Sequence, residues 1–562
     1  MPLKQRVRTS EETRDFVLYS PHLGGGNILH SVLQVNQEAD TPWLTIDRQW
    51  ADADGIQRSE FSLNQLDRLT QAWSVWYVNN GVQPRDRVAI YLDDSFEYLL
   101  HFFALSQIGA IAVLINGHLS SEDALGLCQR TQPVGLYTDE HRLQPLKNRL
   151  RDISGFRWTR TVEEVHPLES CSLPTSARYR HADEDPVLIC HSSGTTGTPK
   201  PVIWTHGQSV AGARYRLSNS CEAPGSIMLS AIPQSHSGAV GFTFYALLAG
   251  IPLIALSNPN ARAVAVAIDR YRPTTVVAFS AIYAELATNV PMKSYDFNSV
   301  NYWINMGDSA HHVHVMSLIR GSREILQDES LPDPVVFIDG LGSSELGWAV
   351  LRRTFTRDTV PDARFIGEPV PFAEVVVLRE DGTAADPYEI GMLGVKSGTL
   401  TPGYWNDSDT NYRSRLRGYW LSGDVVYRDK QNRYYHIDRV SDVIHTLGGE
   451  GYSVFMEETL LLHLSEISDC AVIASHNNLE IVPIAVVKCK YPVDDPEDLL
   501  RRANAALRDA GQIELASLVI AKFEADFPVG PTGKVLKRLL REQFSEFLHR
   551  NTDTADGGLD IK

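Results

Sequence analysis

Short apolar runs alternate with helix-length amphipathic segments over the first 340 residues. A run rich in β-branched residues at 87–92 precedes an apolar-periodic segment at 96–108 and a second apolar run at 110–115. Further apolar runs recur at 187–190, 251–256, 274–279 and 334–338. Continuous apolar strands separated by helices are typical of parallel sheets that are covered on both faces. The pattern therefore predicts layered α/β subdomains with largely parallel strands.

After about residue 360 the chain carries shorter strands with many aromatic and glycine residues. Such strands are predicted at 373–380, 393–398 and 433–439. Short strands of this kind are typical of antiparallel sheets that curve into barrels. We therefore expect a small barrel-like β subdomain after the α/β layers.

A compact block follows from about Val440. The pattern predicts helices at 455–466 and 496–510, strands at 469–475 and 481–489, and a basic helical tail. We place the main boundary at its start. The prediction is a large N-terminal domain of residues 1–438 and a small mobile C-terminal α+β domain of residues 439–562.

One apolar run, at 239–256, has the eighteen residues that just reach the length of a membrane span. Gly250 and Pro252 interrupt it. A buried helix that ends at Gly250, followed by a buried strand, explains the run without a bilayer. No transmembrane segment is therefore predicted.

Composition narrows the class of protein. Of the 562 residues, 43% are hydrophobic and 22% charged, which is ordinary for a globular chain. The 52 basic and 69 acidic residues give a net charge of −17, which argues against a nucleic-acid or anionic-membrane binder. Six cysteines without a CxxC pair, and an N-terminus without an apolar run, favour a reduced, cytoplasmic location.

The most informative segment, at 187–207, runs from a strand directly into a loop rich in Ser, Thr and Gly that contains one lysine. Polyphosphate binding needs such a backbone, because N–H and O–H donors must approach the oxygens while Lys200 supplies positive charge. It is not a Walker loop, since Pro199 stands where that motif has glycine. A flexible surface turn is the alternative, and the position directly after a buried strand argues against it.

This loop resembles the SSGTTGTPK segment of the adenylate-forming superfamily, which includes acyl-CoA synthetases, adenylation domains and firefly-type luciferases. Five further segments resemble that family's motifs, and they occur in the family's order. They are GLGSSELG (340–347), GYWNDSDTN (403–411), GYWLSGDVVYRD (418–429), DRVSDVIHTLGGEGYSVFMEE (438–458) and PVGPTGKVLKR (528–538).

The resemblance implies a role for each matching residue. Thr195, Thr196 and Lys200 would line the β- and γ-phosphates, Ser344 would contact the α-phosphate, and Glu345 would hold Mg²⁺, which prefers oxygen ligands. The whole implied nucleotide site comprises Ser192, Ser193, Gly194, Thr195, Thr196, Gly197, Thr198, Lys200, Asp339, Gly340, Leu341, Gly342, Ser344, Asp424, Arg439 and Lys534.

Three of these residues lie late in the chain. Asp424 would accept both ribose hydroxyls, with an ordinary turn aspartate as the alternative. Arg439 would also contact the ribose. Lys534 would bridge the acyl carboxylate and the phosphate during adenylation, with a solvated lysine of the basic tail, beside Lys537 and Arg538, as the alternative. Gly448 and Gly449 would form the loop that admits the pantetheine thiol.

The chain departs from the family pattern at three positions. Leu341 replaces the tyrosine that stacks on adenine, although Asp339 could still receive the adenine amino group. Ser344 replaces the usual threonine and keeps its hydroxyl. Ser441 occupies the hinge position that usually carries Asp or Lys.

The resemblance also bears on the class of acid substrate, through His236. Acyl- and aryl-activating relatives often have histidine at this position, whereas amino-acid-activating relatives have aspartate. An α-amino acid is therefore disfavoured, and Phe242, Phe279 and Gly307, with Gly340 and Gly342, would line an apolar pocket. Asp308 either caps a helix that begins near Ser309, which we favour, or binds a cationic group of the substrate.

We therefore expect an enzyme that uses ATP and Mg²⁺ to convert a small carboxylic acid to an acyl-adenylate and then transfers the acyl group to coenzyme A. Lys534, Thr196, Glu345 and His236 are the predicted catalytic residues. A stand-alone adenylation enzyme that loads the phosphopantetheine of an acyl carrier protein is the nearest alternative. A luciferase-like oxygenase and a nucleotide-binding pseudoenzyme are more distant alternatives.

Overall fold

The computed structural model describes residues 11–36, 38–51, 55–165, 167, 171–192, 199–219, 222–223, 225–307, 309–322, 335–362, 364–477, 480–529 and 535–544. The chain divides into two compact units. The first comprises Met1–Ser192, Pro199–Val375 and Val395–Trp420, and the second Ser193–Thr198, Val376–Gly394 and Leu421–Lys562. The boundary predicted after residue 438 stays a prediction.

The first unit contains a six-stranded sheet with the order β6-β5-β3-β4-β7-β8, parallel except for β8. The apolar runs that predicted strands at 87–92, 110–115 and 187–190 lie in it and are confirmed. Its strands are β3 (Arg87–Tyr91), β4 (Ile111–Ile115), β5 (Gly135–Thr138), β6 (Trp158–Thr161), β7 (Pro186–His191) and β8 (Pro201–Thr205).

A second sheet of this unit has the order β15-β14-β13-β12-β11-β9-β10-β1-β2. The run from β13 to β1 is parallel. The remaining pairs are antiparallel: β2 with β1, β14 with β13, and β15 with β14. The strands are β1 (Pro42–Ala51), β2 (Gln57–Ser62), β9 (Met228–Ala231), β10 (Leu253–Ala255), β11 (Thr275–Phe279), β12 (Tyr302–Met306), β13 (Val336–Leu341), β14 (Leu351–Phe355) and β15 (Phe365–Pro369).

Helices cover both sheets of the first unit. They are α1 (Glu11–Tyr19), α2 (Ile28–Val35), α3 (Leu63–Asn79), α4 (Glu97–Ser106), α5 (Ser121–Thr131), α6 (Glu140–Leu143), α7 (His206–Asn219), α8 (Ser237–Ala249), α9 (Ala261–Tyr271), α10 (Ser280–Asn289), α11 (His312–Gly321) and α12 (Ser408–Arg413). Helix α4 packs on the six-stranded sheet and α8 on β9, and the two helices meet at Phe102 and Phe244, whose ring centroids lie 5.6 Å apart.

Every residue of α8 is buried, which explains its continuous apolar sequence. The helix ends at Gly250, whose φ of +66° is a left-handed conformation that glycine adopts without steric cost. The predicted buried helix followed by a strand in 239–256 is therefore confirmed. In the described part of the chain, no helix combines the length and apolar character needed to cross a membrane.

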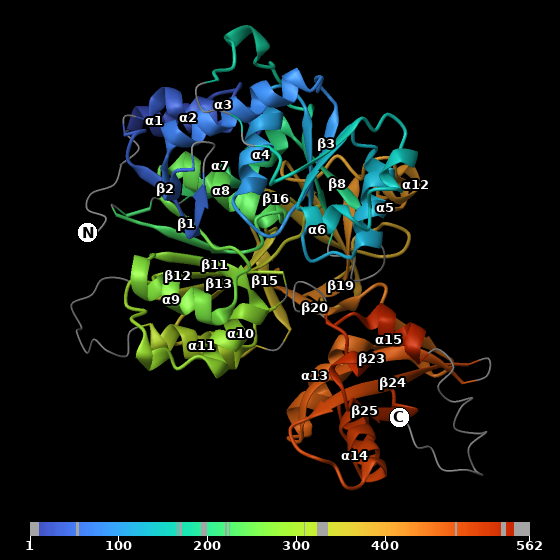
Figure 1. Ribbon diagram of the computed structural model, residues 1–562. Coiled ribbons are helices and arrows are strands. Elements are labelled where there is room, and N and C mark those ends of the chain that lie inside the picture. The colour runs from blue at the N-terminus through green and yellow to red at the C-terminus, as the bar shows by residue number, and fades with distance from the viewer. Residues whose placement is uncertain are drawn as a thin grey trace. The chain divides into compact units, whose positions relative to one another are not determined.

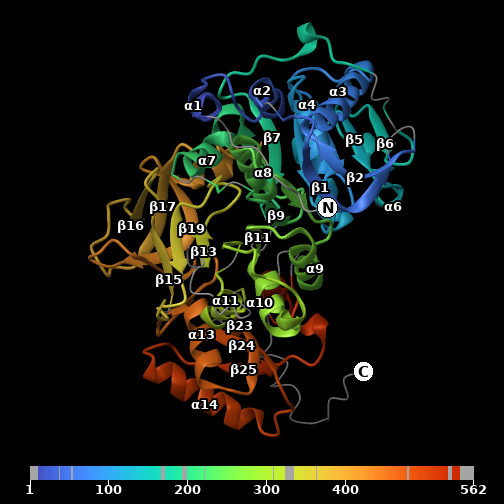
Figure 2. The same ribbon diagram turned by 90° about the vertical axis from the view of Figure 1, so that its left-hand side faces the viewer.

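The strands predicted at 373–380, 393–398 and 433–439 are present as β16, β17 and β20, and β19 pairs antiparallel with β18 and β20. Figure 2 shows β16, β17 and β19 side by side, and β20 continues the order β16-β17-β19-β20. Their bounds, with the short β18 that pairs with β19, are β16 (Ala373–Leu378), β17 (Gly391–Ser397), β18 (Arg415–Leu416), β19 (Tyr419–Arg428) and β20 (Tyr434–Arg439).

The C-terminal part of the second unit is a three-stranded sheet, β23-β24-β25, with helices on both faces (Figure 1). Because side chains alternate along a strand, Val472 and Val487 face α13 and α14, while Ile473 and Val486 face Leu540 of α15. The elements are β21 (Val443–Thr446), β22 (Gly449–Tyr452), α13 (Ser453–His463), β23 (Ile467–Asn477), β24 (Glu480–Cys489), α14 (Pro496–Asp509), β25 (Ser517–Ile520) and α15 (Lys537–Gln543).

Candidate functional site

The neck of the predicted phosphate loop is formed by β7 and β8 of the first unit, where His191 lies opposite Pro201. The Ser192 N–H donates to the Lys200 carbonyl (3.1 Å), and the Lys200 N–H donates to Ser192 Oγ (3.0 Å). The structure thus brings the two ends of the loop together. The other predicted loop residues lie outside the described residues: Ser193, Gly194, Thr195, Thr196, Gly197 and Thr198.

Lys200 and Glu345 meet at Tyr404. The Lys200 Nζ lies 5.4 Å from the centroid of the Tyr404 ring, and the Tyr404 hydroxyl donates to Glu345 Oε1 (3.1 Å). Burial, reinforced by the Glu345 carboxylate, raises the pKa of Tyr404, so the phenol remains a proton donor. One Glu345 oxygen is engaged by Tyr404, and a carboxylate in this position suits Mg²⁺.

Sequence reasoning missed Tyr404, although it is part of the Gly-Tyr-Trp segment. The sequence clue to its position is the glycine before it, Gly403, which takes a φ of +147° that favours glycine. The Ile203 N–H donates to the Gly403 carbonyl (3.0 Å). The Trp405 N–H donates in turn to the Pro201 carbonyl (2.8 Å). These two bonds hold Tyr404 beside β8 and next to Lys200.

Ser344 is buried next to the start of α8 and the end of β7. Its Oγ lies 2.9 Å from Ser237 Oγ, and its carbonyl accepts a bond from Trp204 Nε1 (2.8 Å). The hydroxyl kept in place of the family's threonine thus already belongs to a hydrogen-bond network. The network connects α8, β8 and the segment after β13 that carries Ser344.

His191, at the end of β7, is a second residue that sequence reasoning missed. The Asn116 N–H donates to His191 Nε2 (3.0 Å). Because an amide N–H can only donate, the ring proton sits on Nδ1, which donates to the Ser192 carbonyl (2.9 Å). Burial lowers the pKa of His191, so the ring is neutral and ties the loop neck to the end of β4.

The carboxyl end of β13 carries Asp339, Gly340, Leu341 and Gly342. Asp339 is buried, and it accepts bonds from Asn305 Nδ2 (2.8 Å) and the Ala310 N–H (3.2 Å). A Cβ added at Gly340 would lie 2.8 Å from the Cβ of Ala349, so a side chain there would not fit without displacement. The strand end therefore has no side chain at position 340. The expected adenine contact of Asp339 stays a prediction.

The expected helix start near Ser309 is wrong. Helix α11 begins at His312, with His311 as its N-cap. Ser309 and Ala310 stay in the loop because the carboxylate of Asp339 takes the Ala310 N–H and lies 3.4 Å from Ser309 Oγ. Asp308, predicted to cap the helix, lies outside the described residues.

His236 is the N-cap of α8, and its Nδ1 accepts the Gly238 N–H (3.0 Å). The neutral ring therefore carries its proton on Nε2. Burial, with a smaller effect of His191, lowers the pKa of His236 to about 4, so the ring is neutral near pH 7. Its edge meets Phe279 at 5.2 Å between centroids.

Other predicted pocket residues lie in two groups. Gly307, with a φ of +88°, lies against Phe279: a Cβ added there would be 3.1 Å from a ring carbon. Phe242 packs on Trp348, with 5.0 Å between ring centroids. Trp348 was not predicted, and no pattern in the sequence singles it out. Its place next to Phe242 depends on Gly212 and Gly241, which approach its ring.

In the second unit, Asp424 and Arg439 lie opposite each other on β19 and β20, and their expected contact with a ribose stays a prediction. Asp424 Oδ1 lies 3.2 Å from Arg439 Nε and 3.1 Å from His436 Nε2. Burial alone would raise the pKa of Asp424, but Arg439 and His436 hold it well below its usual range. Asp424 is therefore an ionised acceptor, and His436 is a partner that the sequence did not reveal.

Lys534 lies outside the described residues. Lys537, considered above as a solvated neighbour, is instead largely buried: its Nζ lies 2.7 Å from Glu457 Oε1, and its side chain is only 12% exposed. Burial raises the pKa of Glu457 to about 7, although Lys537 opposes the shift. Arg538 is exposed, and it pairs with Glu542 at 2.8 Å within α15.

A family model described as AMP-binding enzyme matches residues 38–405. The 3-aminoavenalumate diazotase of a Streptomyces species is 36% identical over 557 residues, which is 95% of this chain and 98% of that protein. The 3-hydroxybenzoate–CoA ligase of Aromatoleum sp. (strain CIB) is 24% identical over 486 residues, 82% of this chain and 88% of that protein.

A solved structure with a similar fold is the O-succinylbenzoate coenzyme A synthetase of Bacillus subtilis in complex with ATP and magnesium ion. Its TM-score is 0.74 at 21% identity, and the match covers 92% of this chain and 99% of that chain. The likeness confirms the predicted fold class, in which a large α/β part precedes a smaller α+β part.

Proposed function

Since the chain belongs to the AMP-binding enzymes, which form adenylates, we propose that it adenylates an acid with ATP and passes the activated group to an aromatic amine, as a diazotase does. The observation that carries the proposal is the 36% identity to a diazotase along 95% of this chain. The coenzyme A ligase described above is only 24% identical over a shorter stretch.

The chemistry of the diazo group identifies the acid. A primary aromatic amine becomes a diazonium ion only by gaining a second nitrogen at the oxidation level of nitrite. Nitrite, like a carboxylate, can attack the α-phosphorus of ATP through an oxygen, and pyrophosphate leaves. The amine nitrogen then attacks the nitrogen of the resulting mixed anhydride, AMP leaves, and the amine loses a proton. The N-nitroso product takes up a proton and loses water to give the diazonium ion.

In this proposal the residues around the phosphates act by charge neutralisation and positioning. Two anions, nitrite and the triphosphate of ATP, must meet in line. Lys200 neutralises charge on the β- and γ-phosphates, and Thr195 and Thr196 of the loop supply uncharged hydroxyl donors to the same phosphates. Ser344 contacts the α-phosphate, and Glu345, positioned by Tyr404, holds Mg²⁺, which would supply further positive charge to the phosphates. The hydrogen bond between Tyr404 and Glu345 supports this assignment.

The roles proposed in the second unit rest on charge. Asp424, kept ionised beside Arg439, accepts the ribose hydroxyls, and Arg439 contacts the same ribose. Lys534 places its cation on the α-phosphate during adenylation. Asp339, Gly340, Leu341 and Gly342 are proposed to face the adenine.

The aromatic amine is proposed to bind at His236 and Phe279. The neutral His236 can donate only from Nε2, because Nδ1 already accepts the Gly238 N–H. Such a donor suits an oxygen of an aromatic acid, and the ring of Phe279 suits its apolar face. A neutral histidine also leaves an amino group of the substrate uncharged and nucleophilic, since it offers no anion to stabilise an ammonium ion.

A second candidate is the acyl-CoA ligase reaction, in which a carboxylic acid is adenylated and transferred to coenzyme A or to a carrier-protein phosphopantetheine. The observation in its favour is the hairpin of β21 and β22. Its connection includes Gly448, and Gly449 takes a φ of +130°, a conformation that favours glycine. These two glycines are proposed to form the loop that admits the thiol. The ligase match at 24% identity supports it too.

The two candidates differ in what pyrophosphate release requires. The purified protein is given ATP, Mg²⁺ and 3-aminobenzoate or its matched control 3-hydroxybenzoate, with nitrite or with coenzyme A. A diazotase releases pyrophosphate with nitrite and yields, only from the amine, a diazonium ion that couples to a naphthol to give a dye. Pyrophosphate release that needs the aromatic acid but no nitrite, with a thioester as product when coenzyme A is added, would replace the first candidate with the second.

A further inference from the structure

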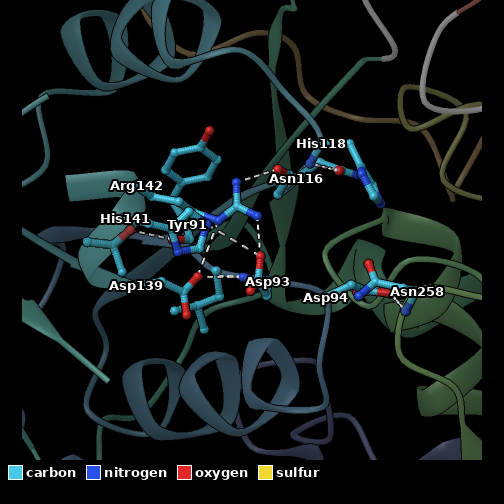
Figure 3. Close-up of polar contacts among 12 residues, drawn as sticks. Tyr91, Asp93, Asp94, Asn116, His118, Asp139, His141, Arg142 and Asn258 are labelled. Carbon is cyan, nitrogen blue, oxygen red and sulfur yellow. Dashed lines mark hydrogen bonds and ion pairs between the residues drawn. The ribbon is translucent and has the colours of Figure 1, made fainter. Parts of the chain in front are cut away.

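Asp94 is a buried carboxylate that no role in the reaction has yet used. It follows β3 of the first unit, and its residue is only 3% exposed. Figure 3 shows it facing Asn258, apart from Asp93 and Asp139, which pair with Arg142. Within the described ranges, no cation lies at ion-pair distance from the Asp94 carboxylate. Such a buried group needs hydrogen-bond donors to compensate for lost hydration.

Two backbone N–H groups supply those donors. Gln234 donates to Asp94 Oδ1 (2.7 Å), and Asn258 donates to Asp94 Oδ2 (3.1 Å). Gln234 lies shortly after β9 and Asn258 shortly after β10, which are neighbouring parallel strands. The Asp94 carboxylate, in the loop after β3 of the six-stranded sheet, therefore binds the segments that follow two strands of the other sheet. Arg48 of β1 holds Asp94 itself by donating to its carbonyl (2.8 Å).

The segment that Asp94 holds through the Gln234 N–H also carries His236. Gln234 is fully buried, and its side chain donates to the Ile232 carbonyl (3.0 Å). The His236 N–H donates to the Pro233 carbonyl (2.8 Å), so the peptide held by Asp94 and the imidazole belong to one turn. A displacement of about 1 Å in such a turn can cost up to about a hundredfold in activity.

We propose that Asp94 is a positioning residue, which holds the Gln234 peptide so that His236 faces the aromatic substrate. The inference rests on the proposed function, because that function places the substrate at His236. Both oxygens of the carboxylate are needed. In Asp94→Asn, the amide keeps one acceptor and turns an NH₂ group toward the other backbone N–H, which then loses its bond.

The test measures binding of two ligands. Titration calorimetry gives the Kd of the non-hydrolysable α,β-methylene-ATP and, in its presence, the Kd of 3-aminobenzoate. In Asp94→Asn we expect the Kd of 3-aminobenzoate to rise by about tenfold, while the Kd of the ATP analogue changes by less than about twofold. Arg48→Gln removes the bond to the Asp94 carbonyl but keeps the carboxylate. This variant should also raise the Kd of 3-aminobenzoate, but by less than Asp94→Asn does.

Asp185→Asn is the matched control. Asp185 is also buried, and its carboxylate accepts the Ala182 N–H (2.8 Å), but it precedes β7 and so lies at the opposite end of the parallel strands. Both Kd values should remain those of the wild type in this variant. If Asp94→Asn changes neither Kd, or weakens both ligands equally, the inference is overturned. If the wild type itself binds no aromatic acid, the proposed function is overturned and the inference with it.

Discussion

Asp94 should make the free energy of unfolding depend on pH, and Asp94→Asn should remove that dependence. Burial raises the pKa of Asp94 from 3.8 to about 6, although the bonds from Gln234 and Asn258 and the charge of Arg48 oppose the shift. The folded protein therefore binds this proton more tightly than the unfolded chain does. Its contribution to stability is fully present below pH 3.8 and is lost as the pH rises through 6.

The magnitude follows from the shift. A difference of about 2.2 pKa units corresponds to about 3 kcal/mol in total, of which about 1.4 kcal/mol is lost between pH 5 and pH 8. Asp94→Asn does not titrate, and its lost hydrogen bond costs about 1–3 kcal/mol equally at every pH. The variant should therefore gain about 1.4 kcal/mol relative to the wild type as the pH rises from 5 to 8.

Urea unfolding followed by tryptophan fluorescence at pH 5, 6, 7 and 8 measures this difference. Arg48 and Asp47, the other charges near Asp94, are present in both proteins, so their titration cancels to a first approximation. A difference in unfolding free energy that stays flat with pH would refute the reasoning. So would one of opposite sign, in which the variant loses relative stability as the pH rises.

Three further outcomes are expected from single substitutions. Tyr404→Phe removes the bond to Glu345, so the KM for MgATP in pyrophosphate release should rise by about tenfold with a loss of about 1 kcal/mol in stability; an unchanged KM would contradict the role of Tyr404. Lys534→Ala should abolish pyrophosphate release but leave conversion of a supplied adenylate largely intact, and equal loss of both steps would contradict its assignment. Glu457→Gln removes the anion in ion-pair contact with the buried Lys537, leaving only the more distant charges of Asp438 and Asp442, and should cost about 3 kcal/mol in urea unfolding at pH 8. Glu457→Leu combined with Lys537→Leu should cost much less.

Features that depend on neighbours along the chain were predictable from the sequence. The end of α8 was predictable because glycine, here Gly250, readily takes the left-handed conformation that ends a helix. The strands of the parallel sheets were predictable from continuous apolar runs. The boundaries were less accurate where strands carry polar ends: the run at 334–338 became a strand at Val336–Leu341 that includes Asp339 and Gly340.

Features that depend on contacts between distant segments were not predictable. Ser309 could not be seen to remain in a loop, because the carboxylate that takes the Ala310 N–H lies 29 residues later. Tyr404 meets Glu345 across 59 residues, and His191 accepts a bond from Asn116 across 75. Lys537 looked solvated because its partner, Glu457, belongs to another helix. Each is a tertiary contact that no local pattern encodes.

The most direct test of the central claim follows the oxygen that attacks ATP. The protein is incubated with ATP, Mg²⁺, 3-aminobenzoate and nitrite labelled with ¹⁸O, and the AMP produced is analysed by mass spectrometry. If nitrite is the acid that is adenylated, one ¹⁸O atom from nitrite appears in AMP, because the bridging oxygen stays with phosphorus when the amine attacks nitrogen. Unlabelled AMP from labelled nitrite, with ¹⁸O appearing instead when the carboxylate of the aromatic acid carries the label, would contradict the account.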